Sequence, residues 1–155
     1  MPSTAQPYPS KKATFPVSEE SVINHHTALI YVMVLVSASD GNMTDAELSQ
    51  IGNIVTHLPI FGDFDPEHLA TLAASCTDLL QEDDGLDTAM ALVSEALPEK
   101  LRETAYALAC DVAAADGEIQ QEELRLLEII RHHLRVGRLP AAAIERGARA
   151  RHAVL

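Results

Sequence analysis

The stretch VSASDGNMTDAEL, residues 36–48, returns 76 residues later as VAAADGEIQQEEL, residues 112–124. Each copy runs from apolar helix-forming residues into Asp-Gly and then into a second helix-forming run that begins with Glu. The same offset pairs Ile54 with Ile130 and Leu58 with Leu134. This many matches at one spacing indicate an internal duplication of a helix–loop–helix unit.

The apolar residues follow a helical period along the rest of the chain, and no stretch alternates strictly at every second residue. The first predicted helix carries Val22, His26, Leu29, Met33 and Val36 on one stripe. Further helices are predicted at about residues 44–57, 65–83, 87–97, 98–115 and 120–134, and after Pro140. We therefore expect an all-α fold of about seven helices, a compact bundle of two repeats with a pseudo-two-fold relation.

The chain is predicted to consist of a short tail and one domain. Residues 1–17 contain four prolines among polar residues, and such a segment buries too little apolar surface to offset its ordering entropy. Residues 18–155 are expected to form a single all-α domain, with repeat one at about 21–83 and repeat two at about 98–151.

Charge is unevenly spread along this acidic chain, which has a formal net charge of −12. Residues 131–155 hold six arginines against Glu145 alone, while the rest of the chain carries nearly all of the acidic residues. The acidic body argues against nucleic-acid binding, because most of that affinity comes from neutralising phosphates. The basic end either neutralises the protein's own acidic body or contacts an acidic partner or an anionic membrane surface.

Cysteine usage and hydropathy predict where the protein works. Cys76 and Cys110 are far apart and form no CxxC motif, which indicates a reducing compartment and no zinc or disulfide framework. No signal peptide is recognisable, and the longest apolar run, residues 28–38, is much shorter than the roughly 20 residues of a membrane span. We expect a cytoplasmic protein without a direct membrane span.

Four carboxylates lie at the loop ends of the predicted core-facing stripes. Asp40 and Asp116 continue the stripes of the helices that precede the two loops, and Glu47 and Glu123 begin those of the helices that follow. Such a position is costly unless hydrogen bonds, a raised pKa or a cation compensates. Helix capping is one explanation, but Gln120 stands in the second copy where Thr44 provides a capping hydroxyl in the first.

The Asp-Gly-x5-Glu spacing matches the second half of a calcium-binding EF-hand loop. The first half is absent, because Val36 and Ala38 occupy the positions of the earlier acidic ligands. Since Ca²⁺ prefers six to eight oxygen ligands, either the two half-sites pool their ligands, or water completes the shell, or no ion binds tightly. The predicted cation ligands are Asp40, Glu47, Asp116 and Glu123, with Ca²⁺ or Mg²⁺ as the ion.

The two Asp-Gly-x5-Glu motifs in an acidic chain of seven predicted helices resemble the TerB-like tellurite-resistance family. The resemblance extends over roughly Ser21 to Arg138, and it is most specific at residues 38–47 and 114–123. It implies a small all-α cytoplasmic domain with an acidic cluster as its metal site, a role in tellurite resistance or a related stress response, and association with a membrane-bound partner. The Pro-rich start and the Arg-rich end lie outside the resemblance.

These observations lead to two functional hypotheses. The first is a stress-response binding module that takes up a divalent cation at the two loops and relays this event to a protein partner, which places the chain in the cytoplasm or at the inner face of the membrane. The second is a metal-independent interaction domain whose acidic residues cap helices. The chain has no nucleophile elbow and no Gly-rich phosphate loop, so we expect neither an enzyme nor catalytic residues.

Overall fold

The computed structural model describes residues 22–39, 41–115, 117 and 119–155, so the predicted tail at 1–17 lies outside the described residues. Within this part of the chain the regular structure is helical throughout, with no strand. The all-α prediction is confirmed. The seven α-helices are α2 (His25–Ser37), α3 (Asp45–His57), α4 (Leu69–Leu80), α5 (Gly85–Ala96), α6 (Arg102–Ala114), α7 (Gln121–Leu134) and α8 (Arg138–Arg151).

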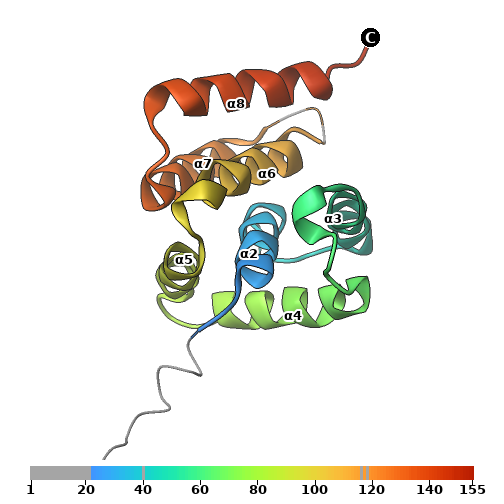
Figure 1. The fold of residues 1–155 in the computed structure, drawn as a ribbon, viewed down its shortest axis with the longest axis vertical. Coiled ribbons are helices and arrows are strands. Elements are labelled where there is room, and N and C mark those ends of the chain that lie inside the picture. Colours follow the sequence, from blue (N-terminus) through green and yellow to red (C-terminus); the bar gives the residue numbers. More distant parts are fainter. Residues whose placement is uncertain (1–21, 40, 116, 118) are drawn as a thin grey trace, which may run out of the picture.

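Helix α2 is the centre of the molecule. It packs against α4, α5 and α6, and it also contacts α3 and α7, so that other helices surround it in Figure 1. All of its residues except His25 are buried. The prediction of a single apolar stripe on this helix was wrong, because α2 has no solvated face, and Val22 lies before the helix and is 66% exposed.

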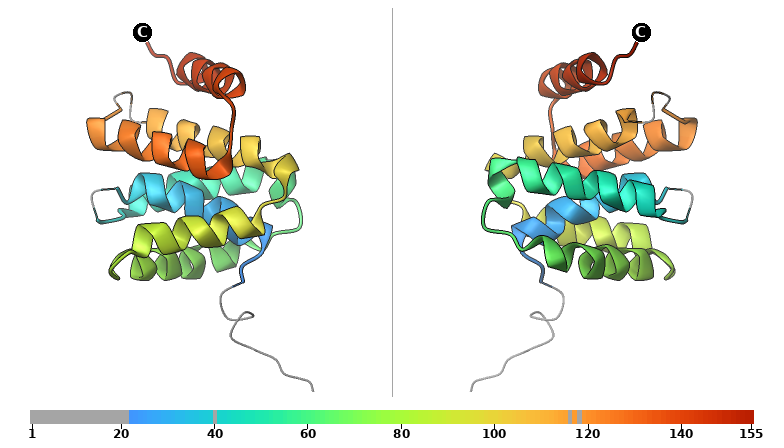
Figure 2. Two further views of the ribbon diagram at one scale, coloured as in Figure 1. Left: turned by 90° about the vertical axis from the view of Figure 1, so that its left-hand side faces the viewer. Right: turned by 90° about the vertical axis from the view of Figure 1, so that its right-hand side faces the viewer.

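The remaining helices lie in layers around this centre. Figure 2 shows α4 and α5 on one side of α2 and α3, and α6 and α7 on the other. Helix α8 forms an outer layer and packs against α6. It does so through small side chains, because Ala141 and Ala148 are its buried residues.

Helix ends follow local sequence signals with four corrections, three at helix starts and one at a helix C-terminus. Helix α3 begins after Thr44 and α7 after Gln120, as predicted. Pro66 and Glu99 instead open short 3-10 helices, Pro66–His68 and Glu99–Leu101, and the α-helices follow them. Helix α4 also ends at Leu80, short of the predicted residue 83. Helix α8 begins before Pro140, which its first turn tolerates because the N–H groups there have no helical partner.

The two sequence repeats fold into similar local structures. Helices α2 and α3 belong to the first copy, α6 and α7 to the second, and the corresponding helices have nearly equal lengths. Gly41 and Gly117 occupy equivalent loop positions with φ of +94° and +85°, a conformation that side-chain-bearing residues rarely adopt. The internal duplication and the pseudo-two-fold relation between the copies both stay predictions.

Candidate functional site

Residues of both repeats line a cavity of about 400 Å³. Glu47, from the first turn of α3, and Glu123, from the first turn of α7, both line it. The other lining residues come from the end of α2 and the start of α7: Val36, Ser37, Ser39, Gln120 and Glu122. Two of the four predicted ligands, 76 residues apart in sequence, therefore share one site. Asp40 and Asp116, the other two, lie outside the described residues.

Glu47 is held in place by a capping box. Its Oε1 accepts hydrogen bonds from the backbone N–H of Thr44 at 2.8 Å and from the Thr44 hydroxyl at 3.0 Å. The Thr44 Oγ1 in turn accepts the Glu47 N–H at 3.1 Å. This arrangement fixes the carboxylate through one oxygen, so Oε2 is the oxygen left to face a ligand.

Glu123 caps its helix although Thr44 has no counterpart in the second repeat. Its Oε1 accepts a hydrogen bond from the backbone N–H of Gln120 at 3.0 Å. The missing hydroxyl was therefore a poor argument against capping, because the reciprocal half of the box needs only the glutamate and a backbone N–H. Both glutamates have a structural role in starting their helices, and each performs it with a single carboxylate oxygen.

Ser37 is a member of this cavity that the sequence did not single out. It is the last residue of α2 and only 8% exposed. Within the part of the chain that the structure describes, its buried Oγ has no hydrogen-bond partner. Burying a hydroxyl without a partner costs about 1–3 kcal/mol, so this atom is a candidate to meet a ligand in the cavity. A serine in an apolar helical run gives no sequence signal for this role.

The described side chains alone do not form a complete metal centre. In residues 22–39, 41–115, 117 and 119–155, no three His, Cys, Asp or Glu side chains gather closely enough to hold an ion. Oxygen donors of the kind that Ca²⁺ and Mg²⁺ prefer do line the cavity: two carboxylates fixed by capping, a third from Glu122, and a hydroxyl.

A family model described as tellurite resistance protein TerB matches residues 26–145, well over half of the chain. The chain belongs to the TerB family. The matched region includes both Asp-Gly-x5-Glu loops and ends within α8. Neither the search of curated proteins nor the search of solved structures found a match.

The basic end of this TerB-family chain is partly neutralised by its own acidic residues. Arg151 in the last turn of α8 pairs with Asp111 of α6 at 2.5 Å, and His152 lies 3.4 Å from the same carboxylate. Helix α8 carries four exposed arginines, Arg138, Arg146, Arg149 and Arg151. Among them only Arg151 has an ion pair in the described chain. The contact with an outside partner stays a prediction.

The histidines of this TerB-family chain serve helix ends and the core. His57 and His133 lie in the last turns of α3 and α7, the predicted position, where a helix dipole favours a cation. His57 also reaches the carbonyl of Asn53 at 2.6 Å. His26 is buried, and its Nε2 lies 2.8 Å from the carbonyl of Ile60 while its ring stacks on Phe61.

Both cysteines are buried and free. Burial raises the pKa of each thiol to about 12, so both are protonated at neutral pH and are poor nucleophiles and poor metal ligands. No described helix is both long enough and apolar enough to cross a lipid bilayer.

Proposed function

We propose that this TerB-family chain is a stress-response module, related to tellurite resistance, that binds a divalent cation between its two acidic loops and relays the event to a protein partner. It acts by binding, without catalysis, in the cytoplasm or at the inner face of the membrane through a membrane-associated partner. Nucleic acid is not among its partners, because its acidic body repels phosphates.

One observation carries this proposal: Glu47 and Glu123 line the same cavity although they belong to different repeats. A single half-loop offers too few oxygen ligands for Ca²⁺, and a shared cavity removes that difficulty by pooling the ligands of both loops. The hydroxyl of Ser37 in the same cavity has no hydrogen-bond partner among the described residues, and it supports the proposal further, since a cation satisfies an oxygen lone pair.

The ligands that would hold the ion are Asp40, Glu47, Asp116 and Glu123, with Ser37 as an additional oxygen donor. Because Oε1 of each glutamate already caps its helix, each offers the ion its second oxygen without a change in helix geometry. All of these donors are oxygens, which favours Ca²⁺ or Mg²⁺ over Zn²⁺.

A shared ion would connect the first turn of α3 to the first turn of α7. Without it, the carboxylates on the two helices repel each other. Binding would therefore hold the two repeats in one relative position at this end of the bundle, and a partner that recognises the surface around both loops would bind the loaded form more tightly. Such a difference in affinity is what a relay requires.

Calorimetric titration of the full chain, stripped with a chelator, tests the proposal with Ca²⁺, Mg²⁺ and Zn²⁺. The informative variant is Glu47→Gln with Glu123→Gln, because the amide oxygen still accepts the capping hydrogen bond and only the charge is lost. Its matched control is Glu67→Gln with Glu103→Gln, which removes two exposed charges far from the cavity in sequence and absent from its lining.

We expect saturable Ca²⁺ or Mg²⁺ binding that weakens at least tenfold in the cavity variant and stays within twofold in the control. Asp40→Asn with Asp116→Asn is expected to weaken it similarly. Absence of saturable binding up to 10 mM ion, or equal losses in both glutamate pairs, would refute the cation site.

The observed capping favours a second function, a metal-independent interaction domain. Both glutamates have a sufficient structural reason to be present, and the exposed arginines of α8 offer an anion-binding face. Deleting α8 would expose the buried residues of α6, so the sharper test is Arg138→Gln with Arg146→Gln. This function predicts that the variant no longer captures its partner, or anionic vesicles, while cations change nothing.

A further inference from the structure

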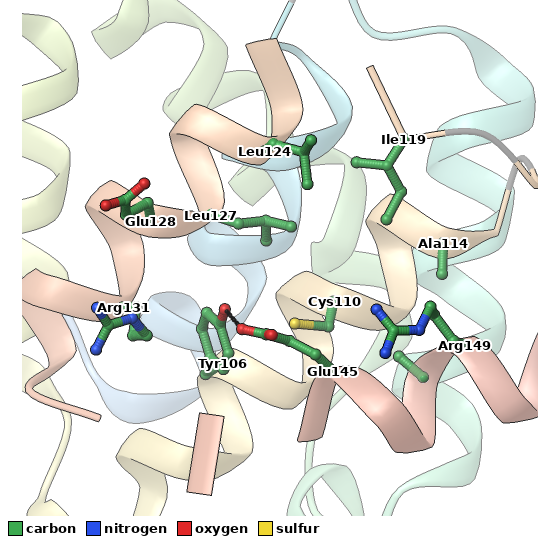
Figure 3. Close-up of a pocket in the computed structure, with 11 residues that line it drawn as sticks. Tyr106, Cys110, Ala114, Ile119, Leu124, Leu127, Glu128, Arg131, Glu145 and Arg149 are labelled. Carbon is green, nitrogen blue, oxygen red and sulfur yellow. Dashed lines mark hydrogen bonds between the residues drawn. The ribbon is translucent and has the colours of Figure 1, made fainter. Parts of the chain in front are cut away.

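A second cavity, of about 330 Å³, lies between α6, α7 and α8 and is separate from the acidic site. Tyr106, Cys110 and Ala114, one face of α6, form its floor. The rest of its lining comes from α7, from α8 and from Ile119 in the loop before α7. The apolar members are Ile119, Leu124, Leu127 and Ala148, and the charged members are Glu128, Arg131, Glu145 and Arg149. Figure 3 shows these side chains around the opening.

The cavity exists because small residues occupy its floor and wall. Ala148 of α8 and Ala114 of α6 are buried and line the cavity. A larger side chain at either position would fill part of the space. Leu127 and Ile119 face this space from the opposite side, and Leu124 is 53% exposed at its edge. The lining is therefore an apolar body with charged residues at the rim, which is the usual form of a small-molecule site.

Three of the four charged lining residues already have partners. The Glu145 Oε2 accepts the Tyr106 hydroxyl at 2.6 Å. Arg131 donates to the carbonyl of Val136 at 3.0 Å, and Glu128 lies 4.0 Å from His132. Arg149 has neither an ion pair nor a hydrogen bond to any described residue.

Arg149 also lies beside the floor of the cavity, as does Glu145. In Figure 3 its guanidinium points toward Cys110, across from the Tyr106–Glu145 pair. A guanidinium presents a planar fork of donors that matches a carboxylate in a bidentate geometry. Among the described residues, the charged group of this cavity without a protein partner is therefore positive, and an anionic group next to an apolar surface would complement it.

The groups on the floor are suited to binding and unsuited to covalent chemistry. Burial raises the pKa of the Cys110 thiol to about 12, so the thiol stays protonated and weakly nucleophilic. Burial and the hydrogen bond to Glu145 raise the pKa of Tyr106 well above its ordinary value, so its hydroxyl remains a donor to that carboxylate. A ligand here would meet a neutral, unreactive floor.

From this arrangement we infer that the cavity binds a small amphiphilic carboxylate, such as a medium-chain fatty acid, with its head group on Arg149 and its chain over Leu127 and Ile119. The volume lies at the lower end of the range for small-molecule pockets, about 300–1,000 Å³, which suits a chain of medium length. This cavity shares no lining residue with the acidic cavity, so its ligand requires no divalent cation.

Calorimetric titration of the full chain in chelator with octanoate, octylamine and octanol, at constant ionic strength, tests this inference. The three probes share one chain and differ in the charge of the head group. We expect saturable octanoate binding that is at least fivefold tighter than the binding of octanol. Octylamine is expected to bind no more tightly than octanol. Octylamine as the best ligand would mean that Glu145 is the anchor and would overturn the assignment, as would no saturation by octanoate at 10 mM.

Three variants at exposed positions, one of them a control, locate the site. Arg149→Gln removes the proposed anchor and should weaken octanoate binding about tenfold, whereas Arg146→Gln, an exposed arginine of α8 that does not line the cavity, should leave it within twofold. Leu124→Asp places a negative charge at the edge and should weaken octanoate more than octanol. Equal losses in the two arginine variants would show attraction to the basic helix in general and refute a built site.

Discussion

Replacing Ser37 with alanine should stabilise the protein in chelator and lose most or all of that advantage when a divalent cation is bound. The side chain is 8% exposed, and its Oγ has no partner in the described chain. Removing an unsatisfied buried hydroxyl recovers a desolvation cost of about 1–3 kcal/mol, and alanine adds up to about 0.5 kcal/mol of helix propensity. In chelator, we therefore expect Ser37→Ala to raise the free energy of unfolding by about 1–2 kcal/mol.

When the ion is present, the free energies of unfolding of parent and variant should become nearly equal, or the parent should become the more stable. An ion at 100 times its dissociation constant stabilises the parent by about 2.7 kcal/mol. If the loss of one oxygen ligand weakens binding tenfold, the same ion concentration stabilises the variant by only about 1.4 kcal/mol. Urea unfolding of parent and variant, in chelator and at a fixed Ca²⁺ concentration, followed by circular dichroism, measures all four free energies.

Ser49→Ala is the matched control, because Ser49 is exposed on α3 and reports helix propensity alone. A Ser37→Ala variant that is less stable than the parent in chelator would show that the hydroxyl has a satisfying partner in the folded protein. Equal stabilisation of parent and variant by Ca²⁺ would remove Ser37 from the ion's ligands.

Three further changes test other parts of the structure. Tyr106→Phe deletes the 2.6 Å hydrogen bond to Glu145 and should lower the free energy of unfolding by about 1–2 kcal/mol in urea; a change below 0.5 kcal/mol would contradict the contact. Burial raises the pKa of Cys76 from 9.0 to about 12. Its stabilising contribution is therefore complete below pH 9 and is lost as pH rises toward 12, at about 1.4 kcal/mol per pH unit; Cys76→Ala should show a shallower alkaline decline than the parent, and identical slopes would refute this. Gly85→Ala would bring a Cβ to 2.9 Å from Leu80 Cα, so we expect a loss of about 1–3 kcal/mol in thermal or urea unfolding, and a neutral effect would contradict the close approach.

Local signals in the sequence predicted much of the fold. Thr44 and Glu47 determine the start of α3 through contacts three residues apart, and the Asp-Gly pairs mark both loops, so these features need no knowledge of the rest of the chain. The arginine pattern of α8 likewise predicted an exposed basic helix. Proline was a weaker signal, because the first turn of either a 3-10 helix or an α-helix accepts it, and this explains the corrections at Pro66 and Pro140.

Features that depend on distant contacts were not predictable from one sequence. The central position of α2 depends on helices that follow it by tens of residues, so its apolar residues could not be distinguished from one wide stripe. The pairing of Tyr106 with Glu145 joins residues 39 apart. Ser37 draws attention only because its buried Oγ has no hydrogen-bond partner among the described residues. The shared cavity of Glu47 and Glu123 required the packing of both repeats.

The burial of α2 has a consequence for how the protein is made. This helix leaves the ribosome before α4, α5 and α6, the helices that cover it. At about 5–20 residues per second, the end of α6 follows that of α2 by roughly 4–15 s. For that interval the most apolar segment of the chain is synthesised but uncovered, which makes the nascent chain a natural client for a ribosome-associated chaperone. Slower translation between α2 and α6 would lengthen the exposure and lower the yield of folded protein.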